Sequence, residues 1–560
     1  MILRRLYLYV VSAAGLALLA VGLAWLGITL LLFAFNDPQA EFSRTSVAVF
    51  GAMTLVALPV WGIHFWFARR FAQRDPAERA SAIRRLYVYW ACLVTALASM
   101  SALAFTIAHL LRPVIDTCHE FPAGPTGAAV CQNRADWLLI TQGAWAAVVF
   151  LAFWAFHLRI AIRDRTLAGE QGASATLRRW YTYIALVVGM LTMLSGAQRV
   201  IELLWVQTLN RPSYDFASDS AGNLLAGGAL WGFHAWLLSR RYAEDDRRST
   251  LRALSGFVVV TVAIATALSG AWLIIYYGIA RALGVRNPGG APDDIVTNLA
   301  GPASLLVVYG IAWFLVRRRL ARDAGAEEGQ RQAAIRRLYI NLASLVSLAA
   351  LAIGAGGVLW YIAEEIEAPL IGVPASDWKD SISRYVALVI VGAAVWFAHW
   401  RPAPWAEDRQ SLSRKLYLWA ALLASVLAVL GYGIFLIYAV LQQLIQQHPR
   451  LDDPNNLDFG HYLAVIVVAA GVGVYHWRVL RADTAARPAR APAQPAARPV
   501  AVASQAVPTP PQGEVLSPHS RRYTLVVADA TDDDVHQALS SLPPQASYKL
   551  TPTEQAVDGR

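Results

Sequence analysis

Charged residues are scarce in this chain. Only 15% of its 560 residues are Asp, Glu, Lys or Arg, whereas 56% are hydrophobic. A soluble protein typically carries about 25% charged residues. The shortage of charge therefore excludes an ordinary soluble protein of this length.

Cysteine is rarer still, with three residues in the whole chain. Cys92 lies in an apolar run, where a thiol acts as a small apolar side chain. Cys118 and Cys131 flank a loop that we expect on the outer side of a membrane, where an oxidising compartment permits a disulfide. Free thiols and a metal pair stay open as alternatives, although no second cysteine pair accompanies this one.

Sequence signatures of chemistry are missing as well. The chain has no C-x-x-C-H haem attachment motif, no phosphate-binding loop, and no two histidines four residues apart. No recognisable catalytic nucleophile stands out. Whether the protein is an enzyme is left open, with a non-enzymatic role favoured, and we expect no metal site.

Long apolar blocks dominate what is present. A bilayer core about 30 Å thick requires roughly 20 helical residues to cross, and runs of that length recur along the chain. The sequence therefore predicts an all-α polytopic membrane protein of about twelve transmembrane helices. The blocks lie at 6–34, 46–67, 86–111, 137–158, 180–205, 220–239, 254–280, 297–316, 339–363, 384–400, 416–442 and 461–480.

Positive charge predicts the orientation of these helices. The five loops that follow even-numbered blocks hold 27 Lys or Arg and 12 acidic residues. Because basic loops stay on the cytoplasmic side, both termini are expected in the cytoplasm. The net charge of +10 belongs mainly to this pattern, so we expect anionic lipid headgroups as partners and no nucleic acid.

A short phrase repeats at the start of every second block. RRLY occurs at 4–7, 84–87 and 336–339, with looser copies RRWY, RKLY and RALS. Each repeat then contains two helices, so all repeats share one orientation. The sequence predicts a transmembrane domain over 1–480 made of six parallel units, at about 1–80, 81–174, 175–250, 251–330, 331–411 and 412–480.

The RRLY phrase is interpreted as an anchor at the membrane boundary. We expect the arginines to stay with water and headgroups, the following Leu or Trp to enter the membrane, and the tyrosine hydroxyl to remain wet. An additional role in binding lipid headgroups or a partner is the alternative.

A second phrase, rich in His, Trp and Arg, ends each unit. Its histidine lies near the inner end of an even-numbered block, and Ala312 replaces it in the fourth unit. Side chains at similar depth on several helices could bind haem or a transition metal. The other interpretation, which we favour, is structural hydrogen bonding near the headgroups. The cofactor-binding candidates are His64, His157, His234, His399 and His476.

Few ionisable residues interrupt the apolar blocks. Arg199 and Glu202 lie one helical turn apart toward an outer helix end, where they form an ion pair or serve as transport candidates. Gly354, Gly356 and Gly357 are expected to allow close helix packing, because small residues let membrane helices approach.

The composition changes beyond the last block. Residues 481–518 form a Pro/Ala-rich linker too poor in large apolar residues to fold. The pattern of residues 519–560 is typical of a short strand, a helix and a possible second strand. It predicts a small α+β cytoplasmic module, with a disordered tail as the alternative. A protein partner for this tail is a further possibility.

The repeated units, opening with RRLY and closing with His and Trp, resemble a bacterial family of two-helix membrane repeats catalogued as a domain of unknown function. The resemblance covers residues 1–480 and implies a multi-pass location in the bacterial cytoplasmic membrane. A membrane scaffold or sensor that presents basic loops and a tethered tail fits the sequence best. A transporter or channel, and a haem-binding redox protein, are the alternatives.

Overall fold

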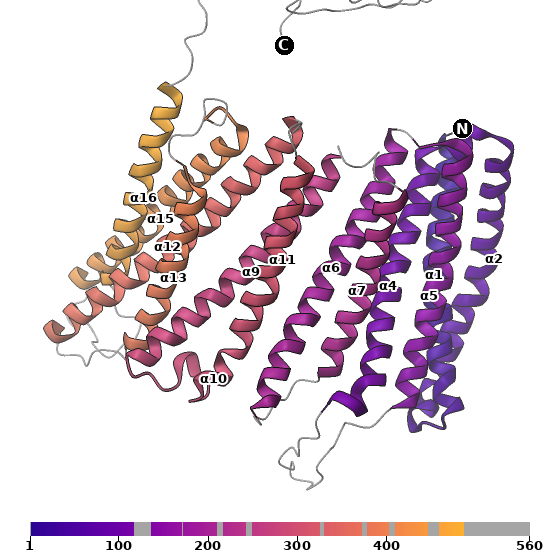
Figure 1. The fold of residues 1–560 in the computed structure, drawn as a ribbon, viewed down its shortest axis with the longest axis horizontal. Coiled ribbons are helices and arrows are strands. Elements are labelled where there is room, and N and C mark those ends of the chain that lie inside the picture. Colours follow the sequence, from indigo (N-terminus) through magenta and orange to yellow (C-terminus); the bar gives the residue numbers. More distant parts are fainter. Residues whose placement is uncertain are drawn as a thin grey trace, which may run out of the picture. The chain divides into compact units, whose positions relative to one another are not determined.

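The chain forms a bundle of long helices in a computed structural model (Figure 1). Backbone polar groups in a bilayer must be satisfied within the protein, which an α-helix does segment by segment. The structure describes residues 2–116, 136–170, 172–209, 217–241, 249–324, 330–371, 378–401, 409–445 and 459–485. Within those residues no strand is present. The linker and tail predicted at 481–518 and 519–560 lie almost wholly outside them.

Within the described residues, twelve long helices correspond one to one to the twelve predicted blocks. They pair into six helical hairpins, referred to below as units 1 to 6. In chain order the helices are α1 (Ile2–Ala34), α2 (Arg44–Arg74), α4 (Ala82–Ile115), α5 (Trp137–Ala168), α6 (Ala173–Thr208), α7 (Ala217–Arg241), α9 (Thr250–Ala282), α11 (Ala300–Ala324), α12 (Gln330–Ile371), α13 (Trp378–His399), α15 (Leu412–Ile445) and α16 (Phe459–Ala485).

Eleven of these helices are long and apolar enough to cross a membrane, among the residues described. The exception is α7, which has 25 residues but contains Asp219, Ser220 and Asn223 in its first half. It packs along both α4 and α6. The described helices therefore support a multi-pass helical membrane fold, and α7 alone among the long helices described does not meet the same criterion of length and composition.

Short elements connect the helices at their ends. Between α1 and α2 lies the 3-10 helix η1 (Pro38–Ser43), and α3 (Pro76–Arg79) follows α2. The segment between α9 and α11 contains η2 (Pro288–Gly290) and α10 (Ile295–Asn298). Proline begins η1, α3 and η2, where its missing N–H would have no partner.

The units associate through one repeated contact. In each hairpin the two helices pack on each other, and the second helix of a unit packs on the first helix of the unit before it. The pairs of this second kind are α1 with α5, α4 with α7, α6 with α11, α9 with α13 and α12 with α16. Figure 1 shows the units following one another across the bundle in chain order. The repetition in sequence is thus a repetition in packing.

Glycine brings paired helices into backbone contact. A Cβ added to Gly196 would lie 2.4 Å from the Leu224 nitrogen, and one added to Gly354 would lie 2.8 Å from the Val389 nitrogen. Gly357 lies against the Tyr385 ring, as expected from the sequence. The same expectation is wrong for Gly356, which has no atom within 4 Å of the added Cβ.

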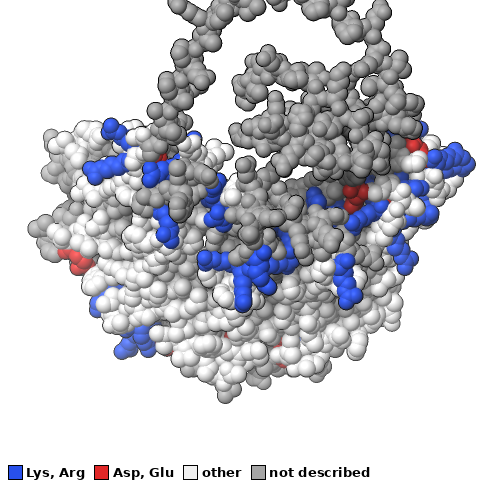
Figure 2. All heavy atoms as spheres, turned by 45° about the horizontal axis from the view of Figure 1, so that its top comes forward, with Lys and Arg blue, Asp and Glu red and all other residues white. Residues whose placement is uncertain are grey.

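Charge and apolar surface are segregated along the helices. Many large apolar side chains are exposed on helix sides, including Leu427 (58%) and Val467 (53%). Figure 2, in which the upper end of Figure 1 is turned forward, shows most of the visible Lys and Arg side chains around that end. An apolar flank with a basic end is the surface expected of a protein embedded in a membrane.

Candidate functional site

The recurrent histidine and tyrosine meet within their own unit. In unit 2 the Tyr87 hydroxyl on α4 lies 3.1 Å from His157 Nε2 on α5. The Trp61 indole of unit 1 donates to the same hydroxyl at 3.0 Å. Both rings are buried, with Tyr87 4% exposed and His157 0% exposed. Three side chains from three helices and two units therefore share one hydrogen-bond chain.

The donor and the acceptor of each of these hydrogen bonds can be assigned by starting from His157. His157 Nδ1 lies 2.8 Å from the Phe153 carbonyl four residues earlier. Because a carbonyl can only accept, Nδ1 carries the hydrogen, and Nε2 of the neutral ring is the acceptor. Tyr87 then donates to Nε2 and accepts from Trp61. We call this arrangement the Trp–Tyr–His chain, and every polar atom in it is satisfied without a net charge.

The arrangement recurs in other units. Each of the five histidines has Nδ1 within 2.9 Å of the carbonyl four residues earlier. The Tyr–His hydrogen bonds are Tyr7 to His64 at 3.1 Å, Tyr181 to His234 at 2.9 Å and Tyr417 to His476 at 2.8 Å. Indoles of the preceding units complete two further chains, Trp154 to Tyr181 and Trp396 to Tyr417.

Two units depart from the pattern. In unit 5 the Tyr339 and His399 rings meet edge-on with centroids 6.0 Å apart, and the Tyr339 hydroxyl has no hydrogen bond to the described residues. In unit 4 Ser255 replaces the tyrosine and Ala312 replaces the histidine. Both replacements fall in one unit, so the pair is absent together. This joint loss is expected if each residue serves mainly to satisfy the other.

Ion pairs lie beside the Trp–Tyr–His chains. Arg84, the first arginine of the unit 2 phrase, donates to Asp164 at 2.7 Å and to the Tyr9 hydroxyl at 3.1 Å. Arg414 in unit 6 donates to Asp483 at 2.6 Å. Each aspartate lies seven residues after the histidine of its unit. The first and second helices of these units are thereby linked by a salt bridge, with Arg84 3% exposed and Arg414 4% exposed.

The loop after each of the first two units supplies a second acceptor. Glu78 accepts from Arg5 at 2.7 Å. Glu170 accepts from Arg178 at 2.8 Å and lies 3.6 Å from Arg85. Arg85 is 0% exposed. A buried guanidinium requires such a partner, because an unpaired charge loses its hydration without compensation.

The anchor interpretation of RRLY is therefore wrong in units 2, 3 and 6. Arg84, Arg178 and Arg414 of these phrases lie in buried ion pairs rather than in water. The tyrosines Tyr87, Tyr181 and Tyr417 are at most 4% exposed, and their hydroxyls are hydrogen-bonded. Unit 1 is closer to the expectation, since Tyr7 is 58% exposed. The apolar residue that follows the two arginines does face outward, as expected: Leu86 is 52% exposed and Trp180 is 46% exposed.

The tryptophans and aspartates of these hydrogen bonds and ion pairs were not predicted from the sequence, although each type recurs at a fixed spacing from the histidine. A tryptophan precedes His64, His157, His234 and His399 by three residues, in W-x-x-H. An aspartate follows His157 and His476 by seven residues. Both spacings place the residue on or near the histidine face of a helix. Their recurrence could have been found, but the identity of the bonded unit could not.

The transport candidates lie at the opposite end of the bundle. Arg199 donates to Glu202 at 2.9 Å within α6. Gln198 donates to Glu202 at 2.8 Å and to Ser304 on α11 at 2.9 Å. A Cβ on Gly301 would lie 3.0 Å from the Glu202 carboxylate. The group therefore joins unit 3 to unit 4, and its transport role stays a prediction.

The described residues were also compared with the metal and cysteine sites considered from the sequence. Within them, no three His, Cys, Asp or Glu side chains cluster in a way that could hold a metal ion. The five histidines bond to tyrosines or backbone carbonyls of their own units. Cys92 is a buried free thiol. Cys118 and Cys131 lie outside the described residues, so their disulfide stays a prediction.

Comparison with known families gives one match. Residues 5–130 and 337–471 match the family model of a domain of unknown function, DUF5671. Each match begins inside an RRLY phrase, at Arg5 and at Arg337, as expected for a repeated unit. The predicted resemblance to a family of unknown function is confirmed. No curated protein and no solved structure matches the chain.

Proposed function

We propose that this protein is a membrane scaffold or sensor whose repeated units hold basic inner loops and a tethered tail at one membrane face. One observation carries the proposal. The polar side chains that recur from unit to unit hydrogen-bond to one another across neighbouring helices, as in Trp61, Tyr87 and His157. Groups used in this way stabilise a platform and are not presented to a substrate.

The proposed location is the bacterial cytoplasmic membrane, with all twelve long helices crossing and both termini in the cytoplasm. Basic loops at one end of the bundle support this orientation. The 25-residue length of α7 and its packing along α4 and α6 support its crossing. Anionic headgroups are the proposed lipid partners of the basic loops. The tail at 519–560 is the proposed contact with a protein partner.

Crosslinking in living cells tests the scaffold role. A photoreactive amino acid placed at Tyr523 in the tail, and separately at Ala77 in the first inner loop, should give adducts with the same partner. Deletion of 488–560 should remove the partner from the Ala77 adduct while the helical region still inserts. Photoreactive residues at Glu41, in the loop at the other end of α2, provide the matched control and should not capture that partner.

Two measurements on the purified full chain would contradict the proposal. Saturable solute flux into proteoliposomes, abolished by Glu202→Gln, would establish a transporter. Stoichiometric haem or metal, lost when two of the five recurrent histidines are replaced by Gln, would establish a cofactor protein. Under the scaffold proposal each single His→Gln replacement instead preserves insertion and lowers stability by a graded amount, because Gln retains hydrogen-bonding capacity.

A further inference from the structure

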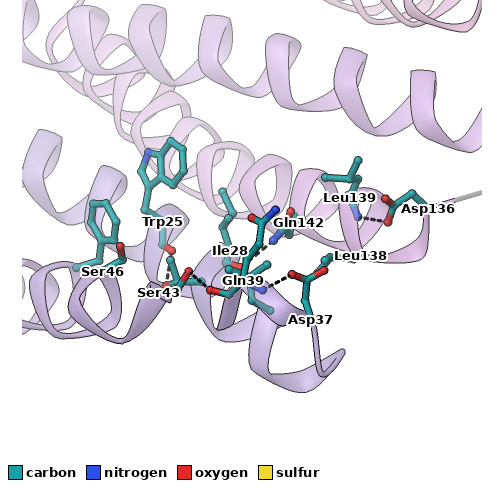
Figure 3. Close-up of a pocket in the computed structure, with 13 residues that line it drawn as sticks. Trp25, Ile28, Asp37, Gln39, Ser43, Ser46, Asp136, Leu138, Leu139 and Gln142 are labelled. Atoms are coloured by element: carbon teal, nitrogen blue, oxygen red, sulfur yellow. Dashed lines mark hydrogen bonds between the residues drawn. The ribbon is translucent and has the colours of Figure 1, made fainter. Parts of the chain in front are cut away.

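A cavity of about 610 Å³ opens in unit 1 at the end opposite the RRLY phrase. It lies between the end of α1, the 3-10 helix η1, the start of α2 and the start of α5 of unit 2 (Figure 3). Its volume falls within the range of about 300 to 1,000 Å³ that is typical of small-molecule sites. The cavity is separate from the Trp–Tyr–His chains.

The wall of the cavity combines aromatic and aliphatic surface. Trp25 on α1 stacks on Phe50 of α2, with ring centroids 5.8 Å apart and an interplanar angle of 18°. Ile28 and Leu139 contribute aliphatic surface. Gln142 of α5 donates to the Ile28 carbonyl at 3.0 Å, which fixes α5 against α1. The apolar wall is therefore held by contacts between two units.

Two carboxylates supply the charge of the cavity. Asp37 Oδ1 accepts from the Gln39 N–H at 2.8 Å, and Asp136 Oδ1 accepts from the Leu139 N–H at 3.1 Å. Each aspartate thus caps a helix through one oxygen, and within the described residues its Oδ2 makes no hydrogen bond. None of the described residues that line the cavity is Lys or Arg. Figure 3 shows both aspartates on the side of the cavity away from Trp25.

We propose that this cavity binds an organic cation with an apolar or aromatic body. The ammonium group donates to the free oxygens of Asp37 and Asp136 in charge-assisted hydrogen bonds. The apolar body of the ligand lies against Trp25 and Phe50 on the other side of the cavity. The inference does not depend on the scaffold role.

Binding of a probe amine to the full chain in nanodiscs tests this site. The probe is 4-phenylbutylammonium, its neutral counterpart is 4-phenylbutanol, and the discs contain phosphatidylglycerol, whose headgroup has no amine. Calorimetry corrected for empty discs should show one saturable site that prefers the amine by about tenfold, equivalent to about 1.4 kcal/mol. Equal affinity for the amine and the alcohol would overturn the proposal.

Isosteric variants connect the binding to the two aspartates. Asp37→Asn and Asp136→Asn should each weaken amine binding by about tenfold, while the caps survive because Asn caps helices as well as Asp. Glu41→Gln removes an exposed acid of the same 3-10 helix outside the cavity and should leave affinity unchanged. Unchanged binding in both Asn variants, or an equal loss in Glu41→Gln, would contradict the assignment.

A second lipid composition identifies the source of the cation. Phosphatidylethanolamine carries an ammonium headgroup and competes for the site if the natural occupant is a lipid. The apparent Kd of the probe then rises in discs that contain it, and the rise is absent from Asp37→Asn. An unchanged Kd assigns the site to a soluble amine. Both results support a cation site, and they differ only in its source.

Discussion

Individual polar residues in this protein are stabilised mainly by a specific partner. The Tyr87 hydroxyl accepts from Trp61 and donates to His157, so one oxygen satisfies two other buried groups. Unit 4, with Ser255 and Ala312, lacks tyrosine and histidine together. A buried donor or acceptor left without its partner costs about 1 to 3 kcal/mol, which makes the loss of both less costly than the loss of one.

Tyr87→Phe should lower the free energy of unfolding by about 1 to 3 kcal/mol, because it leaves the Trp61 indole and His157 Nε2 unsatisfied. Tyr7→Phe is the matched control. Tyr7 is 58% exposed, so water or headgroups replace its hydroxyl and the loss should be smaller. Thermal unfolding of both variants in the same detergent measures the difference, and equal losses would contradict the role of burial.

Asp164→Asn should destabilise the protein by about 3 to 5 kcal/mol, because it leaves the buried Arg84 guanidinium without its counter-charge. Asp293→Asn is the control. Asp293 pairs with Arg281 at the surface, where the side chains are 44% and 45% exposed, and such pairs contribute about 0 to 1 kcal/mol. Chemical denaturation of both variants reports the two losses. Similar values would show that the Arg84 pair is solvated.

At the scale of the helices, close packing depends on where small residues fall. Gly354 on α12 lies against the backbone of α13, whereas Gly356, two residues later, has open space around it. Both glycines appear equivalent in the sequence GAGG. Helical geometry separates them, because residues two apart project about 200° from each other around the axis.

Gly354→Ala should therefore destabilise the protein by about 1 to 3 kcal/mol through overpacking against Val389. Gly356→Ala meets no atom within 4 Å and should be neutral or stabilising by up to about 1 kcal/mol, since alanine favours helix. The melting temperatures of the two variants provide the comparison. A larger loss for Gly356→Ala would show that α12 packs through its other face.

At the scale of the whole molecule, one packing contact is repeated from unit to unit. The second helix of each unit packs on the first helix of the preceding unit, and side chains such as Trp154 cross between units to bond the next tyrosine. Stability in such an array is approximately a sum of unit and interface contributions. The graded effect expected of single His→Gln variants follows from this arrangement.

Cysteine labelling tests the orientation of the array. In a background with Cys118→Ser and Cys131→Ser, an impermeant maleimide added to intact cells should label Glu41→Cys and Asn287→Cys. Ala77→Cys should react only after the membrane is permeabilised, because positive charge places its loop in the cytoplasm. The reverse labelling pattern would show that the protein has the opposite orientation in the membrane. All three positions are exposed in the folded protein.

The sequence by itself determined the all-α fold, the positions of the long helices in the described residues and their pairing into hairpins. These features depend on local composition, because a run of apolar residues of sufficient length requires a helix in lipid. The recurrence of tyrosine and histidine was equally visible. Gln142 and Asp136, by contrast, gave no sign that they border a cavity with Trp25.

Only the tertiary structure decided which of these residues meet. Arg84 and Tyr87 looked like boundary residues because arginine and tyrosine favour the headgroup region. Packing of α4 on α5 instead brings Asp164 and His157 to them, and a buried ion pair replaces hydration. Such pairing depends on contacts about 70 to 80 residues apart in the chain. Local sequence carries the residue types, but the three-dimensional arrangement selects the partners.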